Sequence, residues 1–382
     1  MFDAAAHSFR LVNARVVAEG RVFEGGVAVE AGRIVEVAPG GTGIDLGGDY
    51  LIPGIVDLHT DHVETHLIPR KGVMWSYDEA LAAHDAVVIS GGTTTVYDSL
   101  SVGAMMKNPE RRAFLEPLVD ALEQGAASGR FRAEHILHMR CEICDPETAD
   151  LVDAIIDRDI AQLVSVMDHT PGDRQSPDIE RWTKRMAVEL GVPLEEAIRE
   201  RDEMMARAAR VGPGVRAHVV SAARAHGIIV MSHDDRSPEH IEDSVAEGIS
   251  VAEFPVTRIA AERARAMGQT VVMGAPNYLR GGSQSGNVAL SEILAAELVD
   301  VLASDYVPRS PLDAAFRIAE DPALPQDLPQ AIEMVTRAPA RLTGLEDRGE
   351  IAAGQRADLV RVRRESGRNH VVAVWVEGQR VY

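Results

Sequence analysis

Short, mostly apolar segments recur through the middle of the chain and alternate with segments whose apolar residues have helical spacing. Continuous apolar runs of this length are typical of strands that are buried on both faces of a parallel sheet. Eight segments fit the pattern, at residues 54–59, 93–98, 136–142, 163–169, 227–233, 250–254, 270–276 and 300–305. Eight strand–helix units predict an α/β fold with a closed (β/α)8 TIM-like barrel, and a doubly wound open sheet is the alternative.

The two ends of the chain differ from the middle, because short strand-like segments there are separated by glycines. Residues 8–50 and the C-terminal residues 354–376 share this pattern, which favours hairpins. We therefore expect a composite β-sandwich domain built from residues 1–52 and 345–382, beside a barrel at residues 53–344. Two unrelated β caps are the alternative.

One connection, from residue 171 to about residue 225, is unusually long and rich in charge. It contains two expected helices, at residues 177–190 and 193–210. Long insertions after a barrel strand often cover the active site. The pattern is equally consistent with a lid and with a solvent-exposed pair of helices.

The formal net charge of -20 argues against general binding to nucleic acid or to an anionic membrane. No apolar run reaches the roughly 18 residues that a membrane-spanning helix needs, and no signal peptide is evident at the N-terminus. We expect a cytoplasmic protein that acts on a small molecule. Assembly into a homo-oligomer is compatible with the sequence.

Side chains that can bind metal stand at the ends of the expected strands. His59 and Asp61 are two residues apart, so the period of a strand places both on one face. In a parallel barrel the carboxyl ends of all strands meet at one face. Imidazole and carboxylate groups are good ligands for zinc and related ions. The expected metal ligands are His59, Asp61, Glu142, His169, His233 and Asp305.

The remaining histidines and the two cysteines are weaker candidates for a metal site. Four histidines in helix-like or strand-start positions are expected to be structural or exposed, namely His84, His135, His226 and His240. His62 and His66 follow the first strand and are candidates for a position beside the metal ligands. Cys141 and Cys144 have the spacing of a redox pair or of half a zinc site, but no second cysteine pair exists, and flanking Glu142 is the simpler interpretation.

The chain resembles the amidohydrolase superfamily in the segment 53–59, in Asp305 and in the tail 349–360. Members usually carry His-x-His on the first strand, whereas this chain has His59 followed by Thr and Asp61. Many members bridge two metals with a carbamylated lysine. None of the three lysines lies on an expected strand, so the resemblance implies that Glu142 takes the bridging position.

Further segments resemble the phosphonate-metabolism branch of that superfamily. They are residues 59–70, 92–100, 167–172, 232–235, 252–255, 273–277, 280–287 and 304–308. Enzymes of this branch hydrolyse α-D-ribose 1-methylphosphonate 5-triphosphate to the 5-phosphate and pyrophosphate. The resemblance implies two divalent metal ions, zinc first and manganese or iron as alternatives. Asp305 is then the catalytic proton acceptor as well as a ligand.

A triphosphate needs cations and backbone N–H donors. The expected substrate-binding residues are Arg70, Lys71, Arg140, Asn277, Arg280, Gly281, Gly282 and Ser283. Two other functions remain open on the sequence. One is an amidohydrolase acting on a cyclic amide or N-acyl substrate, although a neutral amide has no use for these cations. The other is a non-catalytic assembly protein, although all six ligand positions hold metal-capable side chains.

Overall fold

The computed structural model describes residues 8–70, 72–103, 111–283 and 285–382. Eight parallel strands form one sheet in sequence order from β6 to β13. Their bounds are β6 Ile55–Thr60, β7 Thr93–Val102, β8 Glu134–Glu142, β9 Ala161–Met167, β10 Ile229–His233, β11 Val251–Glu253, β12 Thr270–Gly274 and β13 Val301–Ala303. A parallel bridge between Thr60 and Asp305 joins the last strand to the first. The expected (β/α)8 barrel is confirmed.

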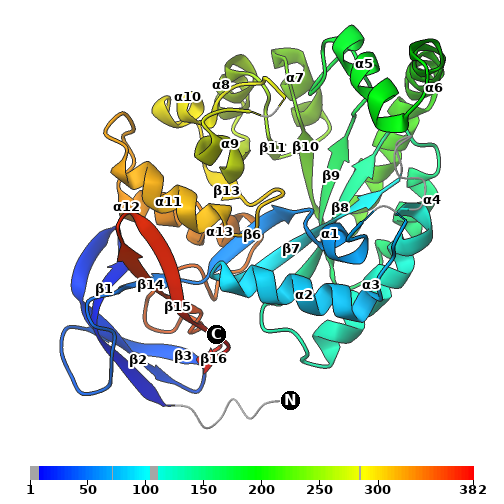
Figure 1. The fold of residues 1–382 in the computed structure, drawn as a ribbon. Coiled ribbons are helices and arrows are strands. Elements are labelled where there is room, and N and C mark those ends of the chain that lie inside the picture. Colours follow the sequence, from blue (N-terminus) through cyan, green and yellow to red (C-terminus); the bar gives the residue numbers. More distant parts are fainter. Residues whose placement is uncertain (1–7, 71, 104–110, 284) are drawn as a thin grey trace.

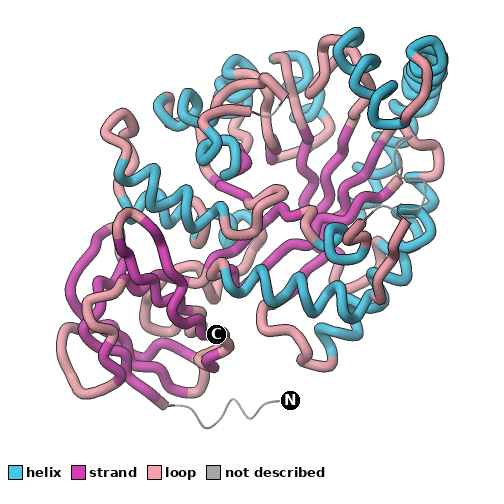
Figure 2. Tube along the Cα trace, viewed as in Figure 1, coloured by secondary structure: helices cyan, strands magenta, loops and turns pink. Residues whose placement is uncertain are grey.

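Helices surround this barrel, as the cyan and magenta tubes of Figure 2 show. The helices are α1 Val63–Leu67, α2 Tyr77–Ser90, α3 Arg111–Ala127, α4 Thr148–Ile155, α5 Ile179–Leu190, α6 Leu194–Ala225, α7 Pro238–Ala246, α8 Arg258–Ala266, α9 Ala275–Arg280, α10 Leu290–Ala295, α11 Ser310–Glu320, α12 Leu328–Glu333 and α13 Arg337–Leu342. Every residue of β7 is buried, as expected for a parallel strand with a core on both sides. None of the helices in the described residues has the length and apolar stretch that crossing a bilayer requires.

Both ends of the chain share one mixed sheet, where the blue and red strands of Figure 1 lie together. Its strands are β1 Phe9–Ala18, β2 Arg21–Glu30, β3 Arg33–Ala38, β4 Ile44–Asp45, β5 Tyr50–Pro53, β14 Leu359–Glu365, β15 Arg368–Val376 and β16 Gln379–Arg380. Antiparallel pairing of β14 with β5 joins the two ends. Buried side chains from both ends, among them Leu11, Leu51 and Trp375, form a separate core. This confirms the second β domain built from both termini.

The long connection contains α5 and α6, as expected. The side chain of Asp178 accepts a hydrogen bond from the backbone of Arg181 and begins α5. α6 continues well past the expected end at residue 210, through Pro213. Its later turns bury Val215 and Val219 against the barrel, so tertiary packing outweighs the helix-breaking tendency of proline. Trp182 of α5 lines a hollow at the candidate site described below, which favours a covering role for this helix.

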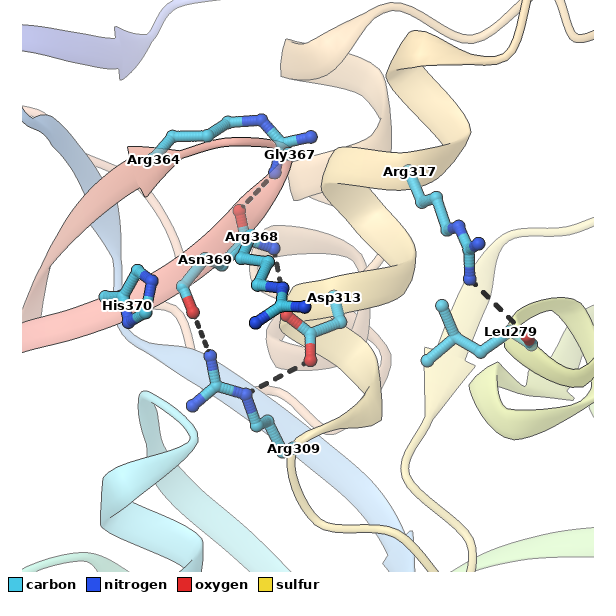
Figure 3. Close-up of a pocket in the computed structure, with 9 residues that line it drawn as sticks. All are labelled: Leu279, Arg309, Asp313, Arg317, Arg364, Gly367, Arg368, Asn369 and His370. Atoms are coloured by element: carbon cyan, nitrogen blue, oxygen red, sulfur yellow. Dashed lines mark hydrogen bonds and ion pairs between the residues drawn. The ribbon is translucent and has the colours of Figure 1, made fainter.

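The mixed sheet meets the barrel beside α11, where a hollow is rich in arginine (Figure 3). Arg309 donates to the carboxylate of Asp313 and to the backbone carbonyl of Asn369 on β15. Arg317 of α11 donates to the carbonyl of Leu279 in α9, at 3.4 Å. The bond from Arg309 to Asn369 links the barrel to the mixed sheet. None of the described residues predicted for the site lines this hollow, so the candidate site lies elsewhere.

Candidate metal centre and active site

The predicted ligands stand at the carboxyl ends of the barrel strands. His59 is the penultimate residue of β6, while Glu142 and His233 end β8 and β10. His169 and Asp305 each follow the end of their strand by two residues. Parallel strands bring these positions to one face of the barrel, where barrel enzymes carry their active sites.

Glu253, the last residue of β11, holds two of the predicted histidine ligands. Its two carboxylate oxygens lie 2.6 Å from Nδ1 of His59 and 2.6 Å from Nδ1 of His233. The Ser165 hydroxyl donates a further hydrogen bond to it. Burial alone would raise the pKa of Glu253, but the two imidazoles hold that pKa well below its ordinary value. Glu253 is therefore a buried carboxylate that fixes the orientation of both rings.

Glu142 has the same relation to His169. One oxygen lies 2.7 Å from Nδ1 of His169, and the other accepts from the His169 backbone N–H at 3.4 Å. Both oxygens thus face His169, which differs from the expected position between two metal ions. Burial raises the pKa of the neighbouring Cys141 and Cys144 thiols, so both are protonated at neutral pH. This is consistent with the structural interpretation of the cysteine pair.

The opposite ring nitrogens are the ones available to a metal. Nε2 of His59 is buried and has no hydrogen-bond partner among the described atoms. Nε2 of His233 and of His169 face one carboxylate oxygen of Asp234, at 3.4 and 3.9 Å. His169, His233 and Asp234 offer ligand atoms within 4.8 Å of one another. A histidine held by a carboxylate on one nitrogen and free on the other is the usual arrangement of a metal ligand. The residues therefore fit a divalent metal centre.

Asp305 completes the centre from the last strand. Its backbone N–H donates to the carbonyl of His59 at 2.8 Å, and its own carbonyl accepts from Asp61 at 3.2 Å. Burial and the nearby Asp61 carboxylate raise the pKa of Asp305 to about 6. Arg140 donates to Asp61 at 3.2 Å and so adds a half-buried positive charge. The structure brings all six predicted ligands to this face of the barrel.

Two hollows flank this centre and share Gln175. The first is lined by Ser101, Gly103, Arg140, Glu142, Met167, His169, Gln175, Ser176, Trp182 and Arg185. The second is lined by residues that include Gln175, Asp234, Phe254, Asn277, Ser283, Asn287, Asp305 and Tyr306. The first hollow has two arginines, whereas the lining of the second combines uncharged polar groups, apolar side chains and the carboxylates of Asp234 and Asp305.

Among the predicted substrate-binding residues, Arg140, Asn277 and Ser283 line these hollows. Arg280 is exposed and donates to the Tyr306 hydroxyl at 3.3 Å, beside the second hollow. Arg70 is exposed and forms a backbone bridge with Val73. Lys71 lies outside the described residues.

The two glycines require a correction. The backbone N–H groups of Gly281 and Gly282 donate to the carbonyls of Tyr278 and Asn277, at 3.0 and 2.8 Å. They cap the C-terminus of α9, for which the positive φ of Gly281, 78°, suits glycine. Their N–H groups are thus already used, and the expected donation to phosphate does not match the structure.

Glu253 and Asp234 are the site residues that the sequence analysis did not assign as ligands or positioning groups. A signal existed for both, because Glu253 lies in the expected strand 250–254 and Asp234 directly follows His233. His138 also lies beside His59, but Ser99 and Ser165 contact its two nitrogens at 2.8 and 2.7 Å. It is therefore a structural histidine.

The remaining histidines that the sequence analysis considered occur in two settings. His226 is exposed and lies 2.6 Å from a carboxylate oxygen of Asp157. His240 is partly buried and contacts Asp173 at 3.1 Å. Four others, His62, His66, His84 and His135, form a separate cluster away from these two.

Comparison with known proteins agrees with this geometry. A family model described as "Amidohydrolase family" matches residues 176–382. The alpha-D-ribose 1-methylphosphonate 5-triphosphate diphosphatase of Escherichia coli (strain K12) is 39% identical over 374 residues, which cover 97% of this chain and 99% of that protein.

Solved structures share the fold at low sequence identity. The N-acetylglucosamine-6-phosphate deacetylase of Pasteurella multocida matches with a TM-score of 0.61 and 13% identity, over 98% of this chain and 99% of that one. The L-hydantoinase of Arthrobacter aurescens matches with a TM-score of 0.55 and 14% identity, over 97% and 95%. At such identities the likeness concerns the fold alone. The family model and the near full-length relative together show that this chain belongs to the amidohydrolase family, in the branch of the ribose methylphosphonate triphosphate diphosphatases.

Proposed function

We propose that this chain is a metal-dependent hydrolase that cleaves α-D-ribose 1-methylphosphonate 5-triphosphate to the 5-phosphate and pyrophosphate. The observation that carries the proposal is the near full-length similarity to a diphosphatase with that activity. The geometry adds that the predicted ligands His59, His169 and His233 adjoin Asp305 and a hollow with Arg140.

The centre is proposed to hold two divalent ions, zinc first and manganese or iron as alternatives. The proposed ligand set comprises Nε2 of His59, which has no hydrogen-bond partner among the described atoms, and Nε2 of His169 and of His233, which face Asp234. The carboxylates of Asp61, Asp234 and Asp305 complete it. When bound, the ions supply positive charge at the attacked phosphoryl group and lower the pKa of a water molecule towards about 7. Glu142 and Glu253 act behind the ligands as positioning residues.

Asp305 is proposed to orient the attacking water and to accept its proton. Burial and the nearby Asp61 carboxylate raise the pKa of Asp305, whereas bound cations would favour its ionised form, which can accept a proton. The water oxygen forms the new P–O bond, and the anhydride bond between the α and β phosphates breaks. Pyrophosphate leaves with the bonding electron pair, so one water molecule is consumed for each substrate.

The two hollows suggest how the substrate lies. Arg140 and Arg185 line the first hollow, where they can neutralise phosphate oxygens as charge accumulates on the leaving group. Ser283 and Asn287 line the second, where hydroxyl and amide groups suit the sugar. Asn277 lines it too, but its amide already bonds to the backbone of Val288 and Leu290. The metal centre lies between them, as cleavage within the triphosphate requires.

The test is product analysis by phosphorus NMR on a ribosyl methylphosphonate triphosphate, a nucleoside triphosphate and a cyclic amide. We expect pyrophosphate and the 5-phosphate from the first compound, with metal-dependent turnover. Turnover of the cyclic amide alone would show that the site hydrolyses a carbonyl group instead.

A further inference from the structure

A second group of histidines lies outside the centre described above. His62 and His66 stand at the start and near the end of α1, and His84 belongs to α2, which packs against α1 (Figure 1). The spacing of four residues places His62 and His66 on one side of the helix. Zinc proteases use the same spacing to bind a metal through two helical histidines.

Each of the three rings presents a buried nitrogen that has no hydrogen-bond partner among the described atoms. These atoms are Nδ1 of His62, Nε2 of His66 and Nδ1 of His84. Leaving a buried polar atom unsatisfied costs about 1–3 kcal/mol. Three such atoms in one place therefore indicate a missing common partner.

The spacing of the rings suits a metal ion. The ring centres of His62 and His66 are 4.9 Å apart, and that of His84 lies 5.9 and 6.1 Å from them. Imidazoles around a tetrahedral zinc, with Zn–N about 2.0–2.1 Å, have ring centres roughly 5 Å apart. One nitrogen from each ring already lies within 4.8 Å of the others. Small rotations of the side chains complete such a site.

The orientation of His84 is fixed from behind. Its other nitrogen, Nε2, lies 2.8 Å from one carboxylate oxygen of Asp98 on β7. The second oxygen of Asp98 lies 2.7 Å from Nδ1 of His135 on β8. Asp98 therefore aims Nδ1 of His84 at the other two histidines, which is the role of the carboxylate in carboxylate–histidine–metal arrangements.

We propose that His62, His66 and His84 bind one zinc-type divalent ion, separate from the metal centre of the barrel mouth. Three imidazole nitrogens suit zinc, and water fills the fourth position. The ion links α1 to α2 and so anchors the segment that carries Asp61, the residue before His62. Its role is structural, because Asp305 and Arg140 belong to the other centre.

The first test is the zinc content of four single variants and one double variant after exhaustive dialysis with zinc chloride and then without it. His62→Gln and His66→Gln should each retain one equivalent of zinc fewer per chain than the wild type. His240→Gln, which changes a partly buried histidine elsewhere, should retain the wild-type content. His233→Asn should lose zinc from the barrel mouth instead. The double variant of His66→Gln and His233→Asn should therefore lose the sum of the zinc lost by the two single variants. Wild-type zinc content in folded His62→Gln and His66→Gln would overturn the proposal.

The second test needs no variant and decides the matter if the substitutions prevent folding. Crystals of the wild-type protein grown with zinc chloride are measured on both sides of the zinc absorption edge. We expect an anomalous peak between the three rings in addition to those at the barrel mouth. Peaks at the barrel mouth alone would overturn the proposal.

Discussion

Two clusters of histidine and carboxylate in this molecule are built alike and differ in their surroundings. In the Glu253 cluster, a buried glutamate lies between His59 and His233. In the Asp98 cluster, a buried aspartate lies between His84 and His135. Each leaves an outward ring nitrogen without a partner among the described atoms, His59 Nε2 in one and His84 Nδ1 in the other.

The two clusters differ in what surrounds them. The Glu253 cluster adjoins two hollows, one with Arg140 and one with Asp305, whose pKa is raised to about 6. The Asp98 cluster lies among buried residues of α2, β7 and β8. Both clusters therefore have imidazoles oriented by a carboxylate, and only the Glu253 cluster adjoins space for a substrate.

The largest expected effect comes from Asp305, which has no counterpart in the Asp98 cluster. Asp305→Asn should lower kcat by at least roughly 100-fold, the lower end for general acid–base catalysis. The amide keeps the size of the side chain, so the fold and most of the metal should remain. Steady-state kinetics and elemental analysis measure both, with His66→Gln as the control that loses metal and keeps most of its activity. Near-normal kcat in Asp305→Asn would exclude the assigned role.

The second-largest expected effect concerns Arg140, the positive charge beside the Glu253 cluster. Arg140→Met should lower kcat/KM for a ribosyl triphosphate by roughly 10- to 150-fold, because a charge-assisted hydrogen bond contributes about 1.5–3 kcal/mol. Arg280→Ala should have a smaller effect, since Arg280 is exposed and contacts the site only through Tyr306. Steady-state kinetics on both variants show which arginine contributes more to kcat/KM. A larger loss for Arg280→Ala would move the phosphate site to the C-terminus of α9.

The positioning role of Glu253 can be tested without touching a proposed ligand. Glu253→Gln should weaken metal binding at the barrel mouth by about 10- to 100-fold, as is typical when the partner of a ligating histidine is changed. The zinc proposed at His62, His66 and His84 should stay bound. Competition with a chromophoric chelator measures the zinc affinity of the two sites separately. Equal weakening of zinc binding at both sites would indicate a general loss of structure.

The smallest expected effect is the pH dependence of the free energy of unfolding that the Asp98 cluster contributes, measured in metal-free protein. Burial alone would lower the pKa of His135, but Asp98 and Asp85 raise it to about 9. Because the ordinary pKa of an unfolded histidine is about 6.5, the stabilisation is complete below that pH and is lost as pH rises towards 9. His135→Gln should therefore lower the free energy of unfolding by up to about 3 kcal/mol at pH 6.

Urea unfolding at several pH values measures this difference, with His226→Gln as an exposed control. The gap between wild type and His135→Gln should narrow from pH 6.5 to pH 9. A gap that is independent of pH would show that packing, rather than charge, is the main contribution of His135.

The sequence by itself determined the barrel and the residues at its mouth. Continuous apolar runs specify parallel strands, and the rule that their carboxyl ends meet at one face brings His59, His233 and Asp305 together. These are local signals, since strand and ligand are read from the same short segment.

Only the tertiary structure decided which atom faces which. Glu253 contacts His59 from 194 residues away, and both oxygens of Glu142 contact His169. The N–H groups of Gly281 and Gly282 are used by the end of α9, and His84 joins His62 and His66 only because α2 packs against α1. Such pairings depend on the stagger of the strands around the barrel and on how each helix returns to it. No short segment of sequence contains that information, because each contact is set by the packing of elements that are distant in the chain.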